Sequence, residues 1–256
     1  MDYLKINKEA WDKRTTVHVK SQYYDVNGFI NGESSLNSIE LNEVGSVEDK
    51  SLLHLQCHFG LDTLSWARLG ANVTGVDLSS EAISQAISIS EKVDLSAKFI
   101  CSDVYKFSEL NNEEFDIVFT SYGALCWLPD LTLWAETIVK SLKPGGQVNI
   151  VEFHPFDEFI LGSAYFSSDD PCVDVDGTYT ENCTGEKSKM LTWVHPISEV
   201  INALISVGIS IESFNEHPYS PYYFEGFEPV ESGEYQLLHS GQNVPLVYSI
   251  KGRKTA

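Results

Sequence analysis

The sequence has few basic residues, no long apolar run and an odd number of cysteines. Lys and Arg number 17 against 37 Asp and Glu, which gives a formal net charge of −20. A surface this acidic repels phosphate backbones, so we expect no nucleic-acid partner. No apolar run reaches the roughly 20 residues of a membrane-spanning helix, and segment 1–5 lacks the apolar core of a signal peptide. We therefore predict a cytoplasmic protein without membrane association.

The cysteines predict neither disulfides nor a metal site. The five are Cys57, Cys101, Cys126, Cys172 and Cys183. None of them forms a pair with the spacing of a metal knuckle, and free thiols suit a reducing compartment. His54 and Cys57 fall on opposite faces of a strand, and no second cluster supplies further ligands. We therefore predict no bound metal.

Hydrophobic patterning predicts alternating strands and helices. The predicted strands are 51–55, 72–77, 97–101, 115–120, 147–151, 209–215 and 245–251, and the predicted helices are 61–69, 80–93, 131–142 and 197–207. This alternation is typical of a parallel sheet covered on both faces. We expect a three-layer α-β-α, Rossmann-like α/β fold with about seven mostly parallel strands. Ligands of such folds bind at the carboxyl ends of the strands, where the strand order reverses.

The remaining segments suggest how a single domain of 256 residues is organised. Residues 1–45 read as an N-terminal helical extension, 46–152 as the core, and 196–256 as a C-terminal helix and strands. The stretch 153–195 is rich in Asp, Ser and aromatic residues. There, 179–181 and 191–193 flank a turn at 184–186, so we expect a hairpin within a small insertion on the substrate side. The aromatic stretch 219–227 is too irregular to assign.

The strongest functional pattern is Leu52-Leu53-His54-Leu55-Gln56-Cys57-His58-Phe59-Gly60, followed after a helix by Asp77. A strand, a tight turn and a helix N-terminus place backbone N–H groups against an anionic group. A carboxylate at the end of the next strand accepts both ribose hydroxyls of an adenosine. Asp77 alternatively reads as a helix-capping aspartate.

With these residues the sequence resembles class I S-adenosylmethionine (SAM)-dependent methyltransferases. Their first motif reads roughly apolar-apolar-Asp-Leu-Gly-Cys-Gly-x-Gly; Leu55, Cys57 and Gly60 match it, while His54, Gln56 and His58 replace the acid and two glycines. The resemblance extends over about 52–152, through Asp77 and the segments 102–104, 115–118 and 142–146. The chain looks like a less-characterised bacterial branch carrying the His-Leu-Gln-Cys-His-Phe-Gly variant.

The resemblance implies SAM as cofactor, S-adenosylhomocysteine (SAH) as product and a small molecule as methyl acceptor. The implied cofactor-binding residues are Leu55, Gln56, Cys57, His58, Gly60, Asp77, Leu78, Ser102, Asp103, Val104 and Ser121. Without glycine at 56 and 58, the loop cannot depend there on glycine-only backbone angles. His54 cannot copy a carboxylate that attracts the ammonium group of SAM, and it reads as a core histidine bonded to a neighbouring strand.

Candidates for acceptor chemistry follow from position. Tyr122, His154 and His195 lie after predicted strands or in the insertion and are candidate general bases. Both histidines precede proline, which favours an extended backbone; each alternatively reads as an ordinary loop histidine. The candidate walls of the acceptor pocket, each alternatively a core residue, are Trp11, Tyr24, Trp127 and Trp193.

Two other functions share part of this pattern. A nicotinamide (NAD(P))-dependent oxidoreductase has the same strand, turn and ribose acid, but this glycine pattern is too degraded for close approach of a pyrophosphate, and no Tyr-x-x-x-Lys pair is present. A non-catalytic SAM-binding module would lack an acceptor cleft. The sequence leaves open whether the protein is a monomer or a homodimer.

Overall fold

A computed structural model describes residues 2–255 of the chain. Its centre is a seven-stranded sheet in which neighbouring strands follow the order β3-β2-β1-β4-β5-β13-β8. The strands in this order are β3 (Ala97–Cys101), β2 (Asn72–Asp77), β1 (Ser51–Leu55), β4 (Phe115–Ser121), β5 (Leu142–Phe153), β13 (Val247–Lys254) and β8 (Ile209–His217). The first five run parallel, whereas β13 is antiparallel to both of its neighbours. The prediction of a Rossmann-like sheet with mostly parallel strands is confirmed.

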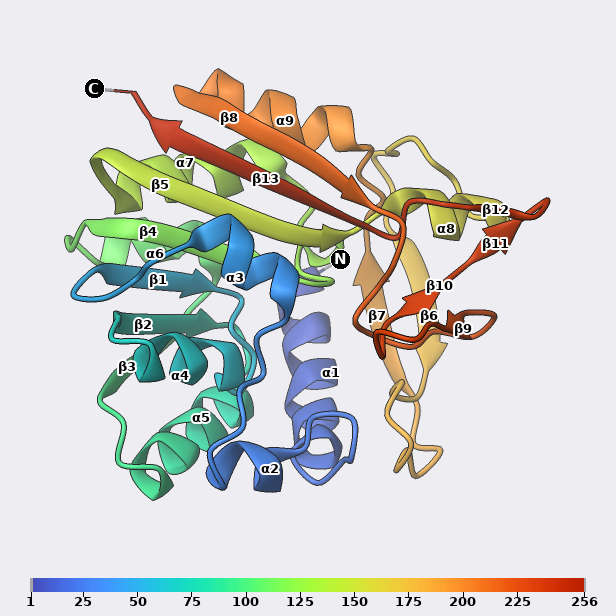
Figure 1. The fold of residues 1–256 in the computed structure, drawn as a ribbon, viewed down its shortest axis with the longest axis horizontal. Helices are drawn as coiled ribbons and strands as arrows, with labels where there is room; N and C mark the ends of the chain where they lie inside the picture. Colours follow the sequence, from blue (N-terminus) through green and yellow to red (C-terminus); the bar gives the residue numbers. More distant parts are fainter. Residues whose placement is uncertain (1, 256) are drawn as a thin grey trace.

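Helices cover both faces of this sheet (Figure 1). In chain order they are α1 (Tyr3–His18), α2 (Val26–Ile30), α3 (Ser38–Val44), α4 (Leu61–Arg68), α5 (Ser80–Lys92), α6 (Val104–Leu110), α7 (Leu131–Ser141), α8 (Pro155–Ile160) and α9 (Ile197–Ser206), with a 3-10 turn η1 at Leu125–Trp127. No helix within residues 2–255 is both long and apolar enough to cross a bilayer.

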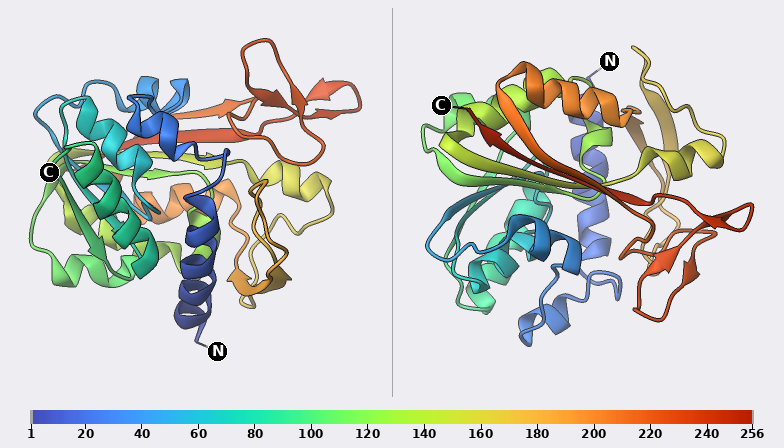
Figure 2. Two further views of the ribbon diagram at one scale, coloured as in Figure 1. Left: turned by 90° about the horizontal axis from the view of Figure 1, so that it is seen from below. Right: turned by 45° about the horizontal axis from the view of Figure 1, so that its top comes forward.

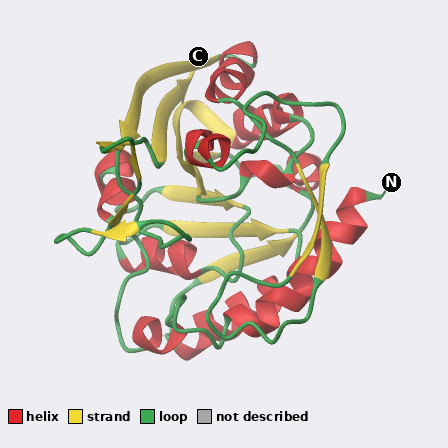
Figure 3. Ribbon diagram, turned by 90° about the vertical axis from the view of Figure 1, so that its right-hand side faces the viewer, coloured by secondary structure: helices red, strands yellow, loops and turns green. Residues whose placement is uncertain are grey.

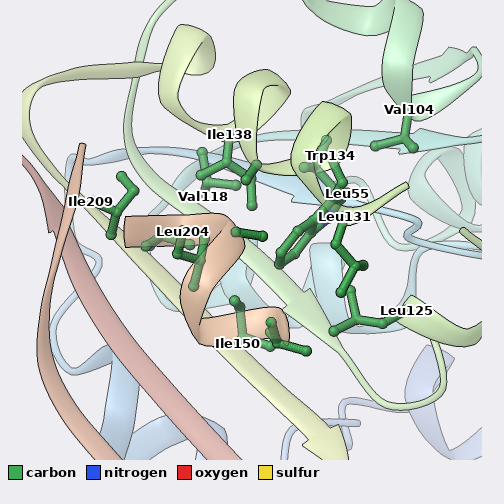
Figure 4. Close-up of a cluster of buried hydrophobic side chains, with 14 of the residues drawn as sticks. Leu55, Val104, Val118, Leu125, Leu131, Trp134, Ile138, Ile150, Leu204 and Ile209 are labelled. Carbon is green, nitrogen blue, oxygen red and sulfur yellow. The ribbon is translucent and has the colours of Figure 1, made fainter. Parts of the chain in front are cut away.

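The alternation of side chains along the strands builds one core on each face. Leu53 and Leu55 of β1 point to the face covered by α6, α7 and α9, where Trp134 is fully buried. Figure 4 shows Leu55 beside Trp134 in this cluster. Leu52 points to the opposite face and packs with Trp66 of α4 and with residues of α3. This two-sided burial fixes β1 in register and holds the loop after it in place.

The insertion contains a hairpin, and its second strand overlaps the predicted segment 191–193. Its strands are β6 (Cys172–Asp176) and β7 (Ser188–Thr192), paired antiparallel. The predicted strand 179–181 was wrong: it lies in the connecting loop, where Tyr179 and Glu181 are held by the N-terminal segment. Helix α8 was not predicted. The unassigned aromatic stretch leads into four two-residue strands, β9 (Glu228–Pro229), β10 (Tyr235–Gln236), β11 (Leu238–His239) and β12 (Gln242–Asn243).

The N-terminal helix and the hairpin lie side by side beyond the carboxyl ends of the parallel strands (Figures 2 and 3). Asn7 joins them: its side-chain amide donates to the Leu191 carbonyl at 2.8 Å, and its oxygen accepts from the Leu191 N–H at 2.9 Å. Arg14 donates to the Gly177 carbonyl at 2.7 Å, and Asn182 donates to the Val17 carbonyl at 2.9 Å. Segments separated by more than 150 residues therefore form one wall facing the sheet edge.

Candidate functional site

The loop after β1 keeps a left-handed backbone at three alternate positions. The φ angles are +58° at Gln56, +50° at His58 and +79° at Gly60. Non-glycine residues reach this region at a cost of roughly 1–2 kcal/mol each, so the loop does not need glycine at 56 and 58. Gly60 is different, because a Cβ there would lie 2.7 Å from the Phe99 ring. Gln56 further fixes the loop by donating to the Ala124 carbonyl at 2.6 Å.

Asp77 ties this loop to the N-terminus of α5. One carboxylate oxygen accepts from the His58 N–H at 2.8 Å, and the other accepts from the Ser79 N–H at 2.8 Å. Burial raises the pKa of Asp77 to about 6, against the lowering effect of these two hydrogen bonds. Each oxygen keeps a second acceptor position. The helix N-cap is Ser79, whose hydroxyl accepts from the Ala82 N–H, so Asp77 is not the helix cap.

A cavity of about 540 Å³ opens at this sheet edge. Every predicted cofactor-binding residue except Leu55 lines it, namely Gln56, Cys57, His58, Gly60, Asp77, Leu78, Ser102, Asp103, Val104 and Ser121. Leu55 points into the core under α7 instead, because strand alternation turns it away from the cavity. Ser102 and Asp103 also stabilise the local backbone. The Ser102 N–H donates to the Asp77 carbonyl, and Asp103 caps α6.

Aromatic residues enclose the other end of the cavity. Trp11, Tyr24 and Trp127 line it as predicted for the acceptor pocket. The Trp11 ring lies 5.1 Å from that of Trp127 and 5.2 Å from that of His58, centroid to centroid. Trp193 does not line the cavity; it packs edge-on against Tyr3 at 5.3 Å, behind the wall. We call the part of the cavity lined by Asp77, Ser102 and Asp103 its polar end, and the part lined by Trp11, Tyr24 and Trp127 its aromatic end.

Of the candidate bases, only Tyr122 reaches this cavity. Its hydroxyl donates to the Glu40 carboxylate at 3.0 Å. Glu40 is fully buried on α3, and burial, followed by the charge of Asp62, raises the pKa of Glu40 to about 7. Sequence reasoning missed Glu40, although Asn37 and Glu40 form a capping box that the sequence displays.

The two histidine candidates lie elsewhere. His154 caps α8 and pairs its Nε2 with Glu216 at 2.9 Å, while His195 lies 2.8 Å from the Leu128 carbonyl. Neither lines the cavity. His154 has the extended backbone expected before proline, with φ −79° and ψ +128°. Both histidine rings are turned toward protein partners. The structure therefore does not support them as bases for this cavity.

Charges around the cavity are mainly negative. The acidic lining residues are Asp25, Glu33, Asp62, Asp77 and Asp103, and Arg14 is the only lysine or arginine among the lining residues of the described chain. This balance favours a ligand that carries a positive charge. Arg14 lies at the aromatic end, with its guanidinium 5.8 Å from the Trp11 ring centroid. Within residues 2–255, no three His, Cys, Asp or Glu side chains gather to hold a metal ion.

The chain is similar to known methyltransferases in sequence and in fold. Residues 53–150 match the protein family described as "Methyltransferase domain". Among curated proteins, the ubiquinone biosynthesis O-methyltransferase of Serratia proteamaculans is 28% identical over 134 residues, covering 51% of this chain and 55% of that enzyme. The enzyme of the same description from Proteus mirabilis is 26% identical over 204 residues, covering 72% of this chain and 81% of its own. The chain thus spans about half the length of the Serratia relative.

Solved structures extend the similarity to almost the whole chain. A SAM-dependent methyltransferase from Methanosarcina mazei superposes with a TM-score of 0.62, covering 86% of this chain and 98% of that chain at 20% identity. At this identity the superposition shows a shared fold.

Proposed function

We propose, from the premise that this chain carries a class I SAM-dependent methyltransferase domain, that it transfers the methyl group of SAM to a small acceptor enclosed at the aromatic end of the cavity. One observation carries the proposal. The Asp77 carboxylate and the left-handed loop 56–60 open into the same cavity as Trp11 and Trp127. A cofactor site and an acceptor site are thus continuous.

The polar end of the cavity fits SAM. Asp77 has both oxygens held by backbone N–H groups and retains acceptor positions for two ribose hydroxyls. Leu78 and Val104 line the same cavity and provide apolar surface. The acidic lining suits a cofactor that carries a sulfonium. SAM supplies a methyl group that is already electrophilic.

The chain's own residues then have two tasks, alignment and exclusion of water. Trp11, Tyr24 and Trp127 restrict the acceptor to a narrow space next to the loop. Holding two reactants in line on the protein removes from the reaction barrier much of the entropic cost of a bimolecular encounter. The segment that follows α1 and the hairpin loop close this space from the side, since Tyr24 and Tyr179 are joined through their hydroxyls.

Tyr122 is the residue we assign to proton removal. Its hydroxyl lines the cavity and donates to Glu40, so it can take a proton from an acceptor while passing its own to that carboxylate. This arrangement is useful for a hydroxyl acceptor, which must lose a proton on methylation. The description of the Serratia and Proteus relatives as O-methyltransferases supports the same choice. The acidity of the chain and the enclosed aromatic site favour a small molecule over a nucleic acid.

Calorimetric titration of the purified protein with SAH and, separately, with NAD tests the cofactor assignment. We expect saturable heat with SAH and none with NAD. Incubation with metabolite extracts and methyl-labelled SAM should then yield a labelled small molecule. Binding of NAD but not SAH would refute the proposal, and SAH binding without labelled product from any extract would favour a non-catalytic module.

A further inference from the structure

Asp62 is a carboxylate of the cavity with no assigned role. It lies in the first turn of α4, two residues after Gly60, and its side chain lines the cavity. One carboxylate oxygen accepts from the Ser35 hydroxyl at 2.6 Å, and the other accepts from the Ser121 hydroxyl at 3.2 Å. Two neutral hydroxyls are thus its hydrogen-bond donors, and no cation of the described chain forms an ion pair with it.

A desolvated carboxylate without a cation is costly to maintain. Burial raises the pKa of Asp62, against the lowering effect of the Ser35 and Ser121 hydrogen bonds. The first turn of a helix favours an acid only weakly. Buried charges in proteins are normally paired with an opposite charge or bound to a ligand. The position of Asp62 at the cavity surface leaves its carboxylate available to a cationic group of a ligand.

Asp62 also stands next to the position where an acid is missing. His54 occupies the place of the acid in the first motif of related methyltransferases, and burial lowers the pKa of His54 to about 3, so its ring is neutral. Its Nδ1 pairs with the Thr63 hydroxyl at 2.9 Å, and its Nε2 lies 3.5 Å from the Ser121 hydroxyl. That same hydroxyl donates to Asp62. The negative charge is therefore displaced from position 54 by one bridging serine.

The other acids of the cavity are less suited to a cation at this place. Asp77 is held by the backbone of the loop and of α5, and Asp103 caps α6. Asp25 and Glu33 are exposed on the N-terminal segment, where water and salt screen their charge. Asp62 alone combines desolvation with contact to Ser121, which ends β4.

We propose that Asp62 binds the α-ammonium group of the methionine part of SAM and SAH, taking over the task of the acid absent at position 54. The inference rests on the proposed function, because it presumes that SAM occupies the cavity. It assigns to this chain a salt bridge made from helix α4 instead of strand β1. Ser35 and Ser121 then hold the carboxylate in position for it.

Equilibrium binding of two ligands to the wild-type chain and to Asp62→Asn tests the assignment. The ligands are SAH and the SAH analogue that lacks the α-amino group but keeps the carboxylate. A charge-assisted hydrogen bond contributes about 1.5–3 kcal/mol, so the wild-type chain should bind SAH about 10- to 100-fold more tightly than the analogue. Asp62→Asn should lose this preference by weakening SAH alone. Glu33→Gln, which removes one exposed acid of the same cavity, should keep it.

Stability of the ligand-free variants separates a binding role from a structural one. Because Asn relieves a desolvated charge, ligand-free Asp62→Asn should be at least as stable as the wild-type chain in urea unfolding. A variant that is destabilised and binds both ligands equally more weakly would overturn the inference, as would an unchanged preference for SAH. If the wild-type chain binds neither ligand, the proposed function itself fails. If it binds both with equal affinity, only the assignment of Asp62 fails.

Discussion

The buried carboxylate of Glu40 makes the stability of this protein depend on pH in a specific direction. Glu40 is fully buried, and its partners are the Asn37 N–H and side-chain amide, at 3.3 and 3.0 Å, and the Tyr122 hydroxyl at 3.0 Å. None of these is a cation. Burial, followed by the charge of Asp62, raises the pKa of Glu40 from 4.5 to about 7. Folding therefore favours the protonated form of this side chain.

The sign and size of the effect follow from proton linkage. A folded-state pKa above the unfolded value gives stability that is fully present below pH 4.5 and is lost as the pH rises through about 7. At about 1.4 kcal/mol per pKa unit, the ionised form costs about 3 kcal/mol above pH 7. Glu40→Gln removes this cost, because a glutamine amide oxygen still accepts from Asn37 and its NH₂ donates to the Tyr122 oxygen.

Urea unfolding followed by tryptophan fluorescence measures the effect at fixed ionic strength. We expect the stability of Glu40→Gln relative to the wild-type chain to increase by about 2 kcal/mol between pH 5 and pH 8. Glu48→Gln, at an exposed position, should show no such change. If the difference in free energy of unfolding between Glu40→Gln and the wild-type chain is the same at both pH values, folding does not raise the pKa of Glu40 and the reasoning is wrong.

Three further substitutions test the site, the wall and the core. Asp77→Ala should weaken SAH binding about 100-fold or more in calorimetry, because two hydrogen bonds from ribose to a charged acceptor are lost; an unchanged affinity would contradict the ribose assignment. Asn7→Ala leaves both backbone groups of Leu191 unpaired and should cost about 1–3 kcal/mol, with faster proteolysis of loop 177–187; an unaltered cleavage rate would show that the wall is held elsewhere. Trp134→Ala should cost about 3–5 kcal/mol in urea unfolding, since this side chain is fully buried under the sheet, and a loss below 1 kcal/mol would contradict its place in the core.

The cofactor end of the site is predictable from sequence because its geometry is local. The loop 56–60 and Asp77 each follow a buried strand directly, and adjacent parallel strands bring their carboxyl ends together. The prediction for Leu55 is wrong because a motif match does not say which face of the sheet a side chain points to. Alternate residues of β1 point to opposite faces, and Leu55 points into the core. Gln56 and His58 keep the left-handed backbone of the loop without glycine, because other residues can adopt this conformation at moderate cost.

The aromatic end of the cavity is not predictable in this way, because its residues meet only through long-range contacts. The Tyr179 hydroxyl lies in a loop whose position depends on Tyr24, some 155 residues away. The backbone preference of a histidine before proline says nothing about the direction of its ring. The rings of His154 and His195 turn to Glu216 and to the Leu128 carbonyl, and neither histidine lines the cavity. Glu40 belongs to a segment with no strand periodicity and is brought to Tyr122 only by the packing of α3 on the sheet.

The part of the chain that matches a known family explains why the comparisons support the cofactor more strongly than the acceptor. The match to the methyltransferase domain covers residues 53–150, which contain the loop, Asp77 and Tyr122. At the aromatic end, Trp11, Arg14, Tyr24 and Tyr179 lie outside that range, whereas Trp127 lies within it. The acceptor is best sought by exchanging these wall residues, and Arg14→Gln is the first exchange to make, because it removes the only cationic side chain that the cavity presents to an acceptor within the described residues.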